Sequence, residues 1–432
     1  MAENSAQAIP PALVEEATVV RSVFAAWGSA PAQGAVPPVA PEVPEPAVAR
    51  TPPLRTPTPD VTYSLPHAVV ATRALAATVR LRCRRRIAYL EKGMGAAQAS
   101  RTLLVLHGLG SSRLANMPGV PDELLCSFGV RLVAIDRPGY GQSDPAPDLS
   151  LHSFCEDLEE LADLLALGRK FYLLGYSAGG AYCWAAAHYI PHRILGIAMW
   201  APFSSFYWQG ISEQDREAMF ACMTPHSRRS LRLGRYAPLW LIRLFIRNFV
   251  VPFSGPLRLQ RLQHSLSHAD RQYLLHPHGA QALLNDNTES LLMGSHGEGM
   301  AKDVELFSRP WPFHILDIGC FSNAQSVRDL TTSSDTRNLG DTATIQDSTC
   351  EPSKITSSSS STHPPAKNLP PPFLVHIWHG TEDVLVPLSL QRWLQQQLPH
   401  LVRLYELPGE GHLSWFCHQP QNHHQVLSTL FS

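Results

Sequence analysis

The sequence Gly-Tyr-Ser-Ala-Gly-Gly around Ser177 has the residue types and spacing of a nucleophile site. An apolar run at 171–174 precedes it and a helical pattern at 181–189 follows it, which predicts a tight strand-to-helix turn. Such a turn strains the backbone of the serine, and side chains two positions away would collide, so Gly175 and Gly179 fit the requirement. We therefore predict that Ser177 is a nucleophile, in preference to a coincidental glycine-rich turn.

A serine hydroxyl needs a base to activate it, and the base needs an acid to orient it. For a serine on this kind of turn, the expected chain order is serine, acid, histidine. Downstream, the apolar run at 374–378 leads to Glu382 and Asp383, and the run at 403–407 leads to His412. Both follow the carboxyl ends of predicted strands, where open α/β sheets build their sites. His412 is the predicted base, and either carboxylate could orient it on chemistry alone.

The oxyanion that forms during acyl transfer needs two backbone N–H donors. The residue after the nucleophile, Ala178, is the predicted first donor. The second is expected in the loop His-Gly-Leu-Gly-Ser-Ser, which directly follows the apolar run at 102–106, and Leu109 is the predicted donor there. These assignments complete an arrangement for acyl transfer.

Two other kinds of site, for a dinucleotide and for a metal, are disfavoured. Gly108 and Gly110, with Asp136 further on, could be half of a dinucleotide-binding fingerprint, but the third glycine is absent and Asp136 opens a turn-rich loop. A histidine and cysteine cluster near the C-terminus superficially suggests a metal, but no catalytic role needs one. Its members are Cys417, His418, His423 and His424. No cofactor and no metal are expected.

The elements that must position these residues are short apolar runs separated by helix-length segments. Strands buried on both faces read as near-continuous apolar runs, and their alternation with helices predicts a parallel sheet, an α/β fold. The helix predicted at 151–167 places its apolar residues on one face. The predicted strands are 102–106, 131–135, 171–174, 194–200, 374–378 and 403–407, with a further period-two stretch at 79–83.

The composition limits the classes of function. The 35 Lys and Arg against 36 Asp and Glu give a formal net charge of −1, which offers no overall electrostatic case for nucleic acid or an anionic membrane. Eight scattered cysteines without a Cys-x-x-Cys pair argue against a zinc ribbon or a disulfide framework. The best candidate for a membrane span, residues 236–253, is interrupted by Arg243 and Arg247, so no transmembrane span is expected.

Two stretches have the composition of disordered chain. Residues 31–60 contain ten prolines, and residues 331–362 contain 17 Ser or Thr. The first 27 residues make a poor secretory signal, so the expected compartment is the cytoplasm, with the chloroplast as the alternative.

Five motifs together resemble the α/β-hydrolase superfamily, and most of all its uncharacterised plant esterase-like hydrolases. They are HGLGSS at 107–112, DRPGYGQSDP at 136–145, GYSAGG at 175–180, HGTEDVLVP at 379–387 and GEGHL at 409–413. By this resemblance Asp383, not Glu382, matches the acid of the family pattern. The resemblance also implies an eight-stranded, mostly parallel sheet flanked by helices, with a helical lid inserted after the sixth strand.

The resemblance implies a division of the chain into five parts. These are a disordered N-terminal segment at 1–74, the first part of the core at 75–202, the lid and the return to the core at 203–318, a disordered insertion at 319–372, and the last part of the core at 373–432. Lid aromatic residues are expected to face the core or an apolar acyl pocket: Phe206, Tyr207, Trp208, Trp240, Phe245 and Phe249.

The expected function is hydrolysis of a small apolar carboxylic ester through an acyl-enzyme. Relatives that open epoxides or remove halogens have an aspartate where this chain has Ser177, so those reactions are disfavoured. Thioesterase or acyltransferase activity, and a slow-turnover ligand receptor on the same fold, are the alternatives. Neither the substrate nor the oligomeric state follows from the sequence.

Overall fold

The computed structural model describes residues 75–115, 117–251, 266–275, 277–292, 296–318, 373–416 and 419–432. The chain divides into two units, Met1–Leu75 and Ala76–Ser432, and the second contains every element below. The segments predicted to be disordered, 1–74 and 319–372, lie outside the described residues, as do Cys417 and His418.

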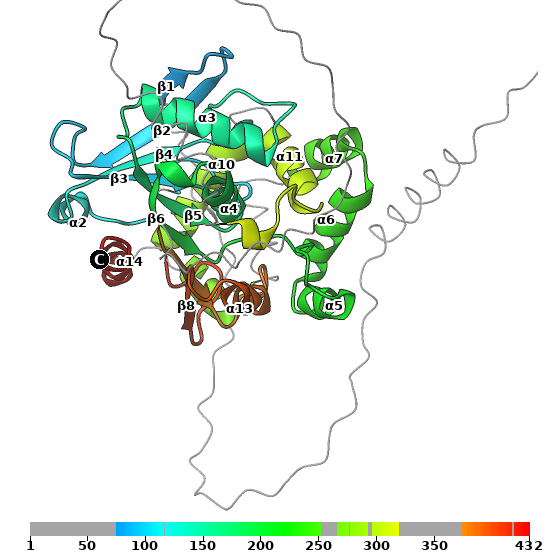
Figure 1. Cartoon of the computed structure of the whole chain (residues 1–432). Helices are drawn as coiled ribbons and strands as arrows, with labels where there is room; N and C mark the ends of the chain where they lie inside the picture. The colour runs from blue at the N-terminus through cyan, green and yellow to red at the C-terminus, as the bar shows by residue number, and fades with distance from the viewer. Residues whose placement is uncertain are drawn as a thin grey trace, which may run out of the picture. The chain divides into compact units, whose positions relative to one another are not determined.

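Eight strands form one sheet in the order β1-β2-β4-β3-β5-β6-β7-β8 (Figure 1). β2 runs antiparallel to its neighbours β1 and β4, and the other neighbouring strands are parallel. The strands are Ala77–Arg80 (β1), Arg86–Gly93 (β2), Arg101–Leu106 (β3), Val130–Ile135 (β4), Phe171–Tyr176 (β5), Ile194–Trp200 (β6), Val375–Gly380 (β7) and Val402–Leu407 (β8). This confirms the predicted mostly parallel sheet, and β3 to β8 match the six predicted apolar runs to within two residues at either end.

Both faces of the sheet are covered by helices, which explains why its central strands are mainly apolar. In β3, Leu104 and Leu106 join the core beneath α3 and α4, while Leu103 and Val105 join the core beneath α2 and α14. The flanking helices are Asp122–Ser127 (α2), Leu151–Leu164 (α3), Gly179–Tyr189 (α4), Leu388–Gln397 (α13) and Pro420–Leu430 (α14).

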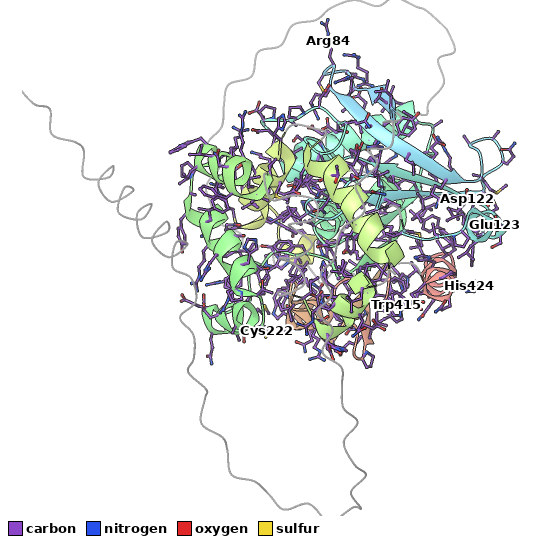
Figure 2. All side chains as sticks on the ribbon, turned by 180° about the vertical axis from the view of Figure 1, so that it is seen from behind. Arg84, Asp122, Glu123, Cys222, Trp415 and His424 are labelled. Carbon is purple, nitrogen blue, oxygen red and sulfur yellow. The ribbon has the colours of Figure 1, made fainter. Side chains whose placement is uncertain are left out.

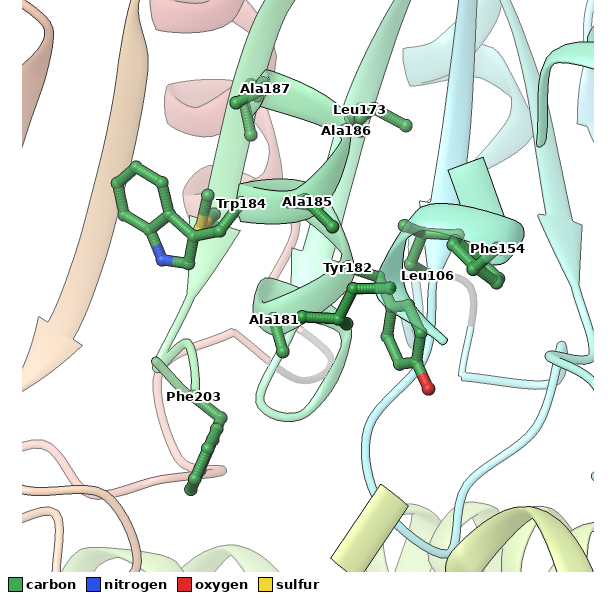
Figure 3. Close-up of a cluster of buried hydrophobic side chains, with 14 of the residues drawn as sticks. Leu106, Phe154, Leu173, Ala181, Tyr182, Trp184, Ala185, Ala186, Ala187 and Phe203 are labelled. Atoms are coloured by element: carbon green, nitrogen blue, oxygen red, sulfur yellow. The ribbon is translucent and has the colours of Figure 1, made fainter. Parts of the chain in front are cut away.

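Helix α4, which begins two residues after Ser177, is buried along almost its whole length. Alanines at 181 and 185–187 let its backbone approach the sheet closely, and Trp184 fills the adjoining space (Figure 3). Tyr182 packs against Phe154 of α3 with ring centroids 4.3 Å apart. The turn that carries Ser177 is thereby anchored on both sides, by the sheet before it and by a packed helix after it.

The described residues between β6 and β7 are mainly helical, and we call residues 203–318 the inserted segment. Its helices are Glu213–Ala221 (α5), Pro225–Tyr236 (α6), Leu239–Phe245 (α7), the π-helix Ile246–Val250 (η2), His268–Leu275 (α9), Pro277–Leu292 (α10) and Glu298–Phe307 (α11). No helix among the described residues is both long and apolar enough to cross a membrane.

The aromatic residues of the inserted segment do not share one environment. Phe206 and Trp208 are buried in the main core and the half-buried Tyr207 packs against it, as expected. Phe245 is half-buried and stacks on Phe249, with ring centroids 5.3 Å apart. The expectation was wrong for Trp240 and Phe249, which are 63% and 49% exposed. The reason is that α7 and η2 use another face, which includes Ile242 and Ile246, for packing.

Candidate active site

Ser177 lies at the carboxyl end of β5, in a turn that leads directly into α4. Its φ is 49°, in the left-handed region that residues other than glycine seldom adopt. Its N–H donates to the carbonyl of Trp200 (2.9 Å), and its carbonyl accepts from the N–H groups of Gly180 (2.9 Å) and Phe203 (2.7 Å). Backbone strain of this kind costs about 1 to 3 kcal/mol and clusters at functional sites.

The two glycines that flank Ser177 are required by close contacts. A Cβ atom on Gly175 would lie 2.5 Å from Cys183 Sγ, and one on Gly179 would overlap the carbonyl oxygen of Leu106. Neither position has room for a side chain, which is the steric reason that the sequence suggested.

Asp383 and His412, from the loops after β7 and β8, form a buried pair. His412 Nδ1 lies 2.7 Å from Asp383 Oδ2, and Asp383 Oδ1 accepts from the N–H groups of Leu385 (2.8 Å) and Val386 (3.0 Å). Glu382, the other candidate acid, is exposed. Of the two neighbouring carboxylates, the structure thus brings Asp383 against the imidazole.

The electrostatics of the pair favour a charged carboxylate. Burial raises the pKa of Asp383, but the charge of His412 and hydrogen bonds from His379 and His412 outweigh it and hold that pKa well below its usual range. Burial lowers the pKa of His412, but Asp383, together with Asp270, raises it above its ordinary value. An ionised Asp383 fixes the proton on Nδ1 of a neutral His412 and leaves Nε2 as a base.

Trp200, the last residue of β6, connects the turn that carries Ser177 with the loop that carries His412. Its carbonyl accepts from the N–H of Ser177, and its indole Nε1 donates to the carbonyl of His412 (2.8 Å). The ring of Tyr176, adjacent to Ser177 in the chain, lies with its centroid 5.7 Å from that of His412. The predicted nucleophile and base are therefore neighbours at the same edge of the sheet.

Asp270, on helix α9 of the inserted segment, is a buried residue that the sequence did not single out. Its carboxylate accepts from three successive backbone N–H groups of the loop that carries the base: His412 (2.9 Å), Leu413 (2.6 Å) and Ser414 (3.1 Å). A side chain on Gly411 would overlap this carboxylate. The inserted segment thus fixes the backbone position of His412.

The loop after β3, where the second oxyanion donor was predicted, passes directly beside Ser177. A Cβ atom on Gly108 would lie 3.3 Å from Ser177 Cβ. The preceding residue, His107, has Nδ1 2.8 Å from the carbonyl of Gly108, while its Nε2 accepts from the N–H of Arg137 (3.0 Å). Burial and the charge of Arg137 hold the pKa of His107 well below its ordinary value, so this neutral ring braces the loop.

A buried ion pair connects the same loop to α11. Arg137 donates to the carbonyls of His107 and Gly108 (both 3.1 Å) and to the carboxylate of Asp303 (2.7 Å). Asp303 is completely buried and also accepts from two tyrosine hydroxyls, those of Tyr140 (2.6 Å) and Tyr182 (2.5 Å). Arg137 contacts both oxygens of the carboxylate, which brings the total to four hydrogen bonds. The carboxylate is thus satisfied despite its burial.

Helix α10 holds the other end of the loop. Asp286 accepts from the hydroxyls of Ser111 (2.5 Å) and Ser112 (2.6 Å) and from the N–H of Ser112 (2.8 Å). The adjacent Asn287 donates to the carbonyl of Gly110 (2.9 Å). Leu109 lies between these anchored residues with its side chain 39% exposed, whereas Ala178 is buried at the start of α4.

Asp286 predicts a pH dependence of stability. Burial raises its pKa to about 7, although hydrogen bonds from Ser111 and Ser112 lower it. Because an unfolded aspartate titrates near 3.9, the folded chain binds the extra proton between about pH 4 and 7, so the free energy of unfolding falls as the pH rises through this window. We expect Asp286→Asn to make the melting temperature fall several degrees less between pH 5 and 8 than in the wild type.

The control for this measurement is Asp122→Asn, at an exposed aspartate on the outer surface of α2 (Figure 2). It should keep the wild-type dependence of melting temperature on pH. Equal slopes for Asp286→Asn and the wild type would show that Asp286 titrates at an ordinary pKa.

Comparison with known proteins places the chain in a family. Residues 101–418 match the profile of the alpha/beta hydrolase fold family. The curated relatives include bifunctional epoxide hydrolase 2 of Sus scrofa and of Mus musculus, which are 28% and 27% identical over 116 residues. That alignment covers 26% of this chain and 20% of each relative, so the chain spans about a fifth of the length of these relatives.

Solved structures with a similar fold include a bromoperoxidase from Bacillus anthracis (16% identity, TM-score 0.49) and a thermophilic esterase from Thermogutta terrifontis (17% identity, TM-score 0.46). The bromoperoxidase match covers 83% of this chain and 99% of that one, and the esterase match covers 83% and 98%. Since the family profile matches well over half of the chain, the protein belongs to the α/β hydrolase fold family. The narrower resemblance to plant esterase-like hydrolases stays a prediction.

Proposed function

We propose that this protein is a serine hydrolase that cleaves a small carboxylic ester through a covalent acyl-enzyme. Ser177 is the nucleophile, His412 the general base and acid, and Asp383 the residue that orients the imidazole. The backbone N–H groups of Leu109 and Ala178 stabilise the oxyanion. The reaction needs no cofactor and no metal.

One observation carries the proposal. A serine with a strained backbone at the end of β5 shares one sheet edge with a buried imidazole–carboxylate pair whose Nδ1–Oδ2 distance is 2.7 Å. A structural histidine does not need an ionised, fully hydrogen-bonded carboxylate beside it, whereas a catalytic base does.

In the proposed reaction, the Ser177 hydroxyl gives its proton to His412 Nε2 while Oγ forms a bond to the ester carbonyl carbon. The resulting oxyanion accepts hydrogen bonds from the two backbone N–H groups. His412 then passes the proton to the leaving alkoxide, and the acyl–oxygen bond breaks. Water, deprotonated by His412, attacks the acyl-enzyme in turn, and the acid is released with Ser177 restored.

Two of the relatives are named as epoxide hydrolases, but we do not propose epoxide opening for this chain. A carboxylate that opens an epoxide forms an ester, which water can hydrolyse. A serine alkoxide that opens an epoxide forms an ether, which water does not cleave at an enzymatic rate. Ser177 therefore favours acyl substrates, where the covalent intermediate is an ester.

We further propose that the inserted segment, residues 203–318, is a lid over a core formed by 75–202 and 373–432. Asp270, Asp286 and Asp303 support this role, because each carboxylate binds a loop of the site or an arginine that holds one. Contacts of the segment with the acyl group would then decide which ester is accepted.

The test is covalent labelling of the wild type with a fluorophosphonate probe, followed by peptide mapping. We expect one adduct on the peptide that contains Ser177, and hydrolysis of p-nitrophenyl esters whose rate varies with acyl length. Labelling at another serine would overturn the assignment. A folded chain that binds esters but neither reacts with the probe nor turns them over would be a ligand receptor instead.

A further inference from the structure

The outer faces of α6, α7 and η2 carry an unusual concentration of exposed apolar side chains. Tyr236 is 77% exposed, and Leu244 is half exposed, like Trp240 and Phe249. These four residues lie within 14 consecutive positions, yet they make up four of the eleven exposed large apolar side chains of the described residues. A scattered exposed leucine needs no explanation, but a cluster of this kind marks an interaction site.

The same stretch is strongly basic although the whole chain is nearly neutral. From 218 to 269 the sequence contains eight arginines and not one aspartate or glutamate. Some of these arginines are engaged: Arg243 pairs with Glu298 (2.7 Å), and Arg235 lies over the ring of Tyr207 (4.8 Å). Arg232 is exposed and lies 3.7 Å from the carboxylate of Glu217, which is exposed too. Arg229 and Arg247 are exposed, and no ion pair of the described residues includes them.

The apolar and basic side chains lie on one face of each helix. Along α6, Arg229, Arg232 and Tyr236 follow the spacing of three and four residues that keeps side chains on one side. Trp240, Leu244 and Arg247 repeat that spacing along α7 and η2. We call these six residues together with Phe249 the α6–α7 surface.

Packing on α11 leaves this surface turned outward. On the inner side, a Cβ atom on Gly234 of α6 would overlap the carbonyl of Val304, and one on Gly297, the residue before α11, would lie 2.7 Å from Ile246. Helices α6 and α7 consequently run along an outer edge (Figure 1), and Cys222, between α5 and α6, marks one end of it (Figure 2).

We propose that the α6–α7 surface docks on an anionic phospholipid bilayer. Trp and Tyr rings settle at the level of the headgroups, Leu and Phe bury apolar area just below them, and arginines bind lipid phosphates. A second copy of this chain is a poorer partner, because two such surfaces would bring arginine against arginine. A nucleic acid would leave the leucine and the phenylalanine without a partner.

Docking requires no membrane-spanning helix, and none is found among the described residues. The surface would lie at the boundary between bilayer and water instead of crossing the bilayer. Arg247, which interrupts the apolar stretch for insertion, is suited to the headgroup region. The whole chain is nearly neutral, but α6 and α7 are locally basic. The net charge of the chain therefore does not exclude an anionic membrane as a partner of these two helices.

The test is cosedimentation of the full chain with phosphatidylcholine vesicles that contain about 30% phosphatidylserine, beside vesicles of phosphatidylcholine alone. We expect binding to the anionic vesicles that weakens with added salt. The Arg229→Gln/Arg247→Gln variant should bind about thirtyfold more weakly, because each arginine at an anionic surface contributes about a factor of five. Trp240→Ala/Leu244→Ala should lose at least about tenfold on the same vesicles.

The matched controls are Leu164→Ala, at an exposed leucine of α3, and Arg169→Gln, at an exposed arginine outside the surface, and both should bind like the wild type. Circular dichroism checks that every variant is folded. Failure of the folded wild type to bind anionic vesicles, or equal binding by the surface variants and the controls, would overturn the proposal. So would tight binding to duplex DNA without vesicle binding, or a dimer that only the surface variants dissociate.

Discussion

Replacing Ser177 with alanine is expected to lower kcat for ester hydrolysis by roughly 10⁶-fold and to abolish labelling by fluorophosphonate. The reason is that the proposed covalent route through Ser177 is lost, so only the much weaker catalysis by the oxyanion donors and by substrate binding remains. KM should change little, because the lost interaction is made only with the transition state. Steady-state kinetics with p-nitrophenyl esters over a range of substrate concentrations, at a known enzyme concentration, measure both constants.

The control for this substitution is Ser428→Ala, which removes a serine hydroxyl that donates to the carbonyl of Gln425 within its own helix, α14. It should keep wild-type kcat and labelling. If Ser177→Ala retained more than about a hundredth of the wild-type kcat, a different nucleophile would have to be sought, and the proposed mechanism would be wrong.

The strands and the turn around Ser177 could be anticipated because each is written in a short stretch of sequence, whereas only the family resemblance distinguished Asp383 from Glu382 as the partner of His412. A strand buried on both faces must be almost entirely apolar, as β6 and the last four residues of β3 are, and a strained serine turn must have small neighbours, as at Gly175 and Gly179. Requirements of this kind act within a few residues. They leave a local pattern that can be read without knowing the rest of the fold.

The supports of the site could not be anticipated in the same way. Asp270 meets Leu413 across 143 residues, and Asp286 meets Ser112 across 174. Nothing in the local sequence of a helical aspartate distinguishes one that caps a distant loop from one that faces water. A partial signal did exist for Arg137, which lies in the motif after β4, but its partner Asp303 comes from the inserted segment.

The three aspartates give the inserted segment a part in holding the loops of the candidate site. Each comes from a different helix, α9, α10 or α11, and each satisfies backbone N–H groups or an arginine that would otherwise be buried without a partner. A movement of α9 would therefore displace the backbone of His412, and a movement of α10 would displace the loop next to Ser177. Substrate contacts with these helices can in this way be coupled to the geometry of the reacting groups.

Replacing Asp383 with asparagine is expected to lower kcat by about 10⁴-fold while leaving KM nearly unchanged. An asparagine amide can donate a hydrogen bond to Nδ1 of His412, which favours the tautomer with the proton on Nε2. In that tautomer Nε2 cannot accept the proton of Ser177. The loss of charge also changes the pH profile. His412 must be neutral to act as a base, and Asp383 raises its pKa, so the wild-type kcat/KM should decline as the pH falls through a value above 6.5.

In Asp383→Asn the remaining activity should decline at a lower pH than in the wild type, because the imidazolium is no longer stabilised by the carboxylate. Glu382→Gln is the matched control, because it removes a carboxylate one position away but from an exposed side chain. It should keep the wild-type kcat and the wild-type decline of kcat/KM at low pH, the acidic limb of the pH profile. The two variants separate a general effect of negative charge on this loop from a specific contact with His412. Equal losses of kcat in both variants would indicate a general effect of negative charge. A loss confined to Asp383→Asn, together with a shifted acidic limb, requires a specific contact between Asp383 and His412.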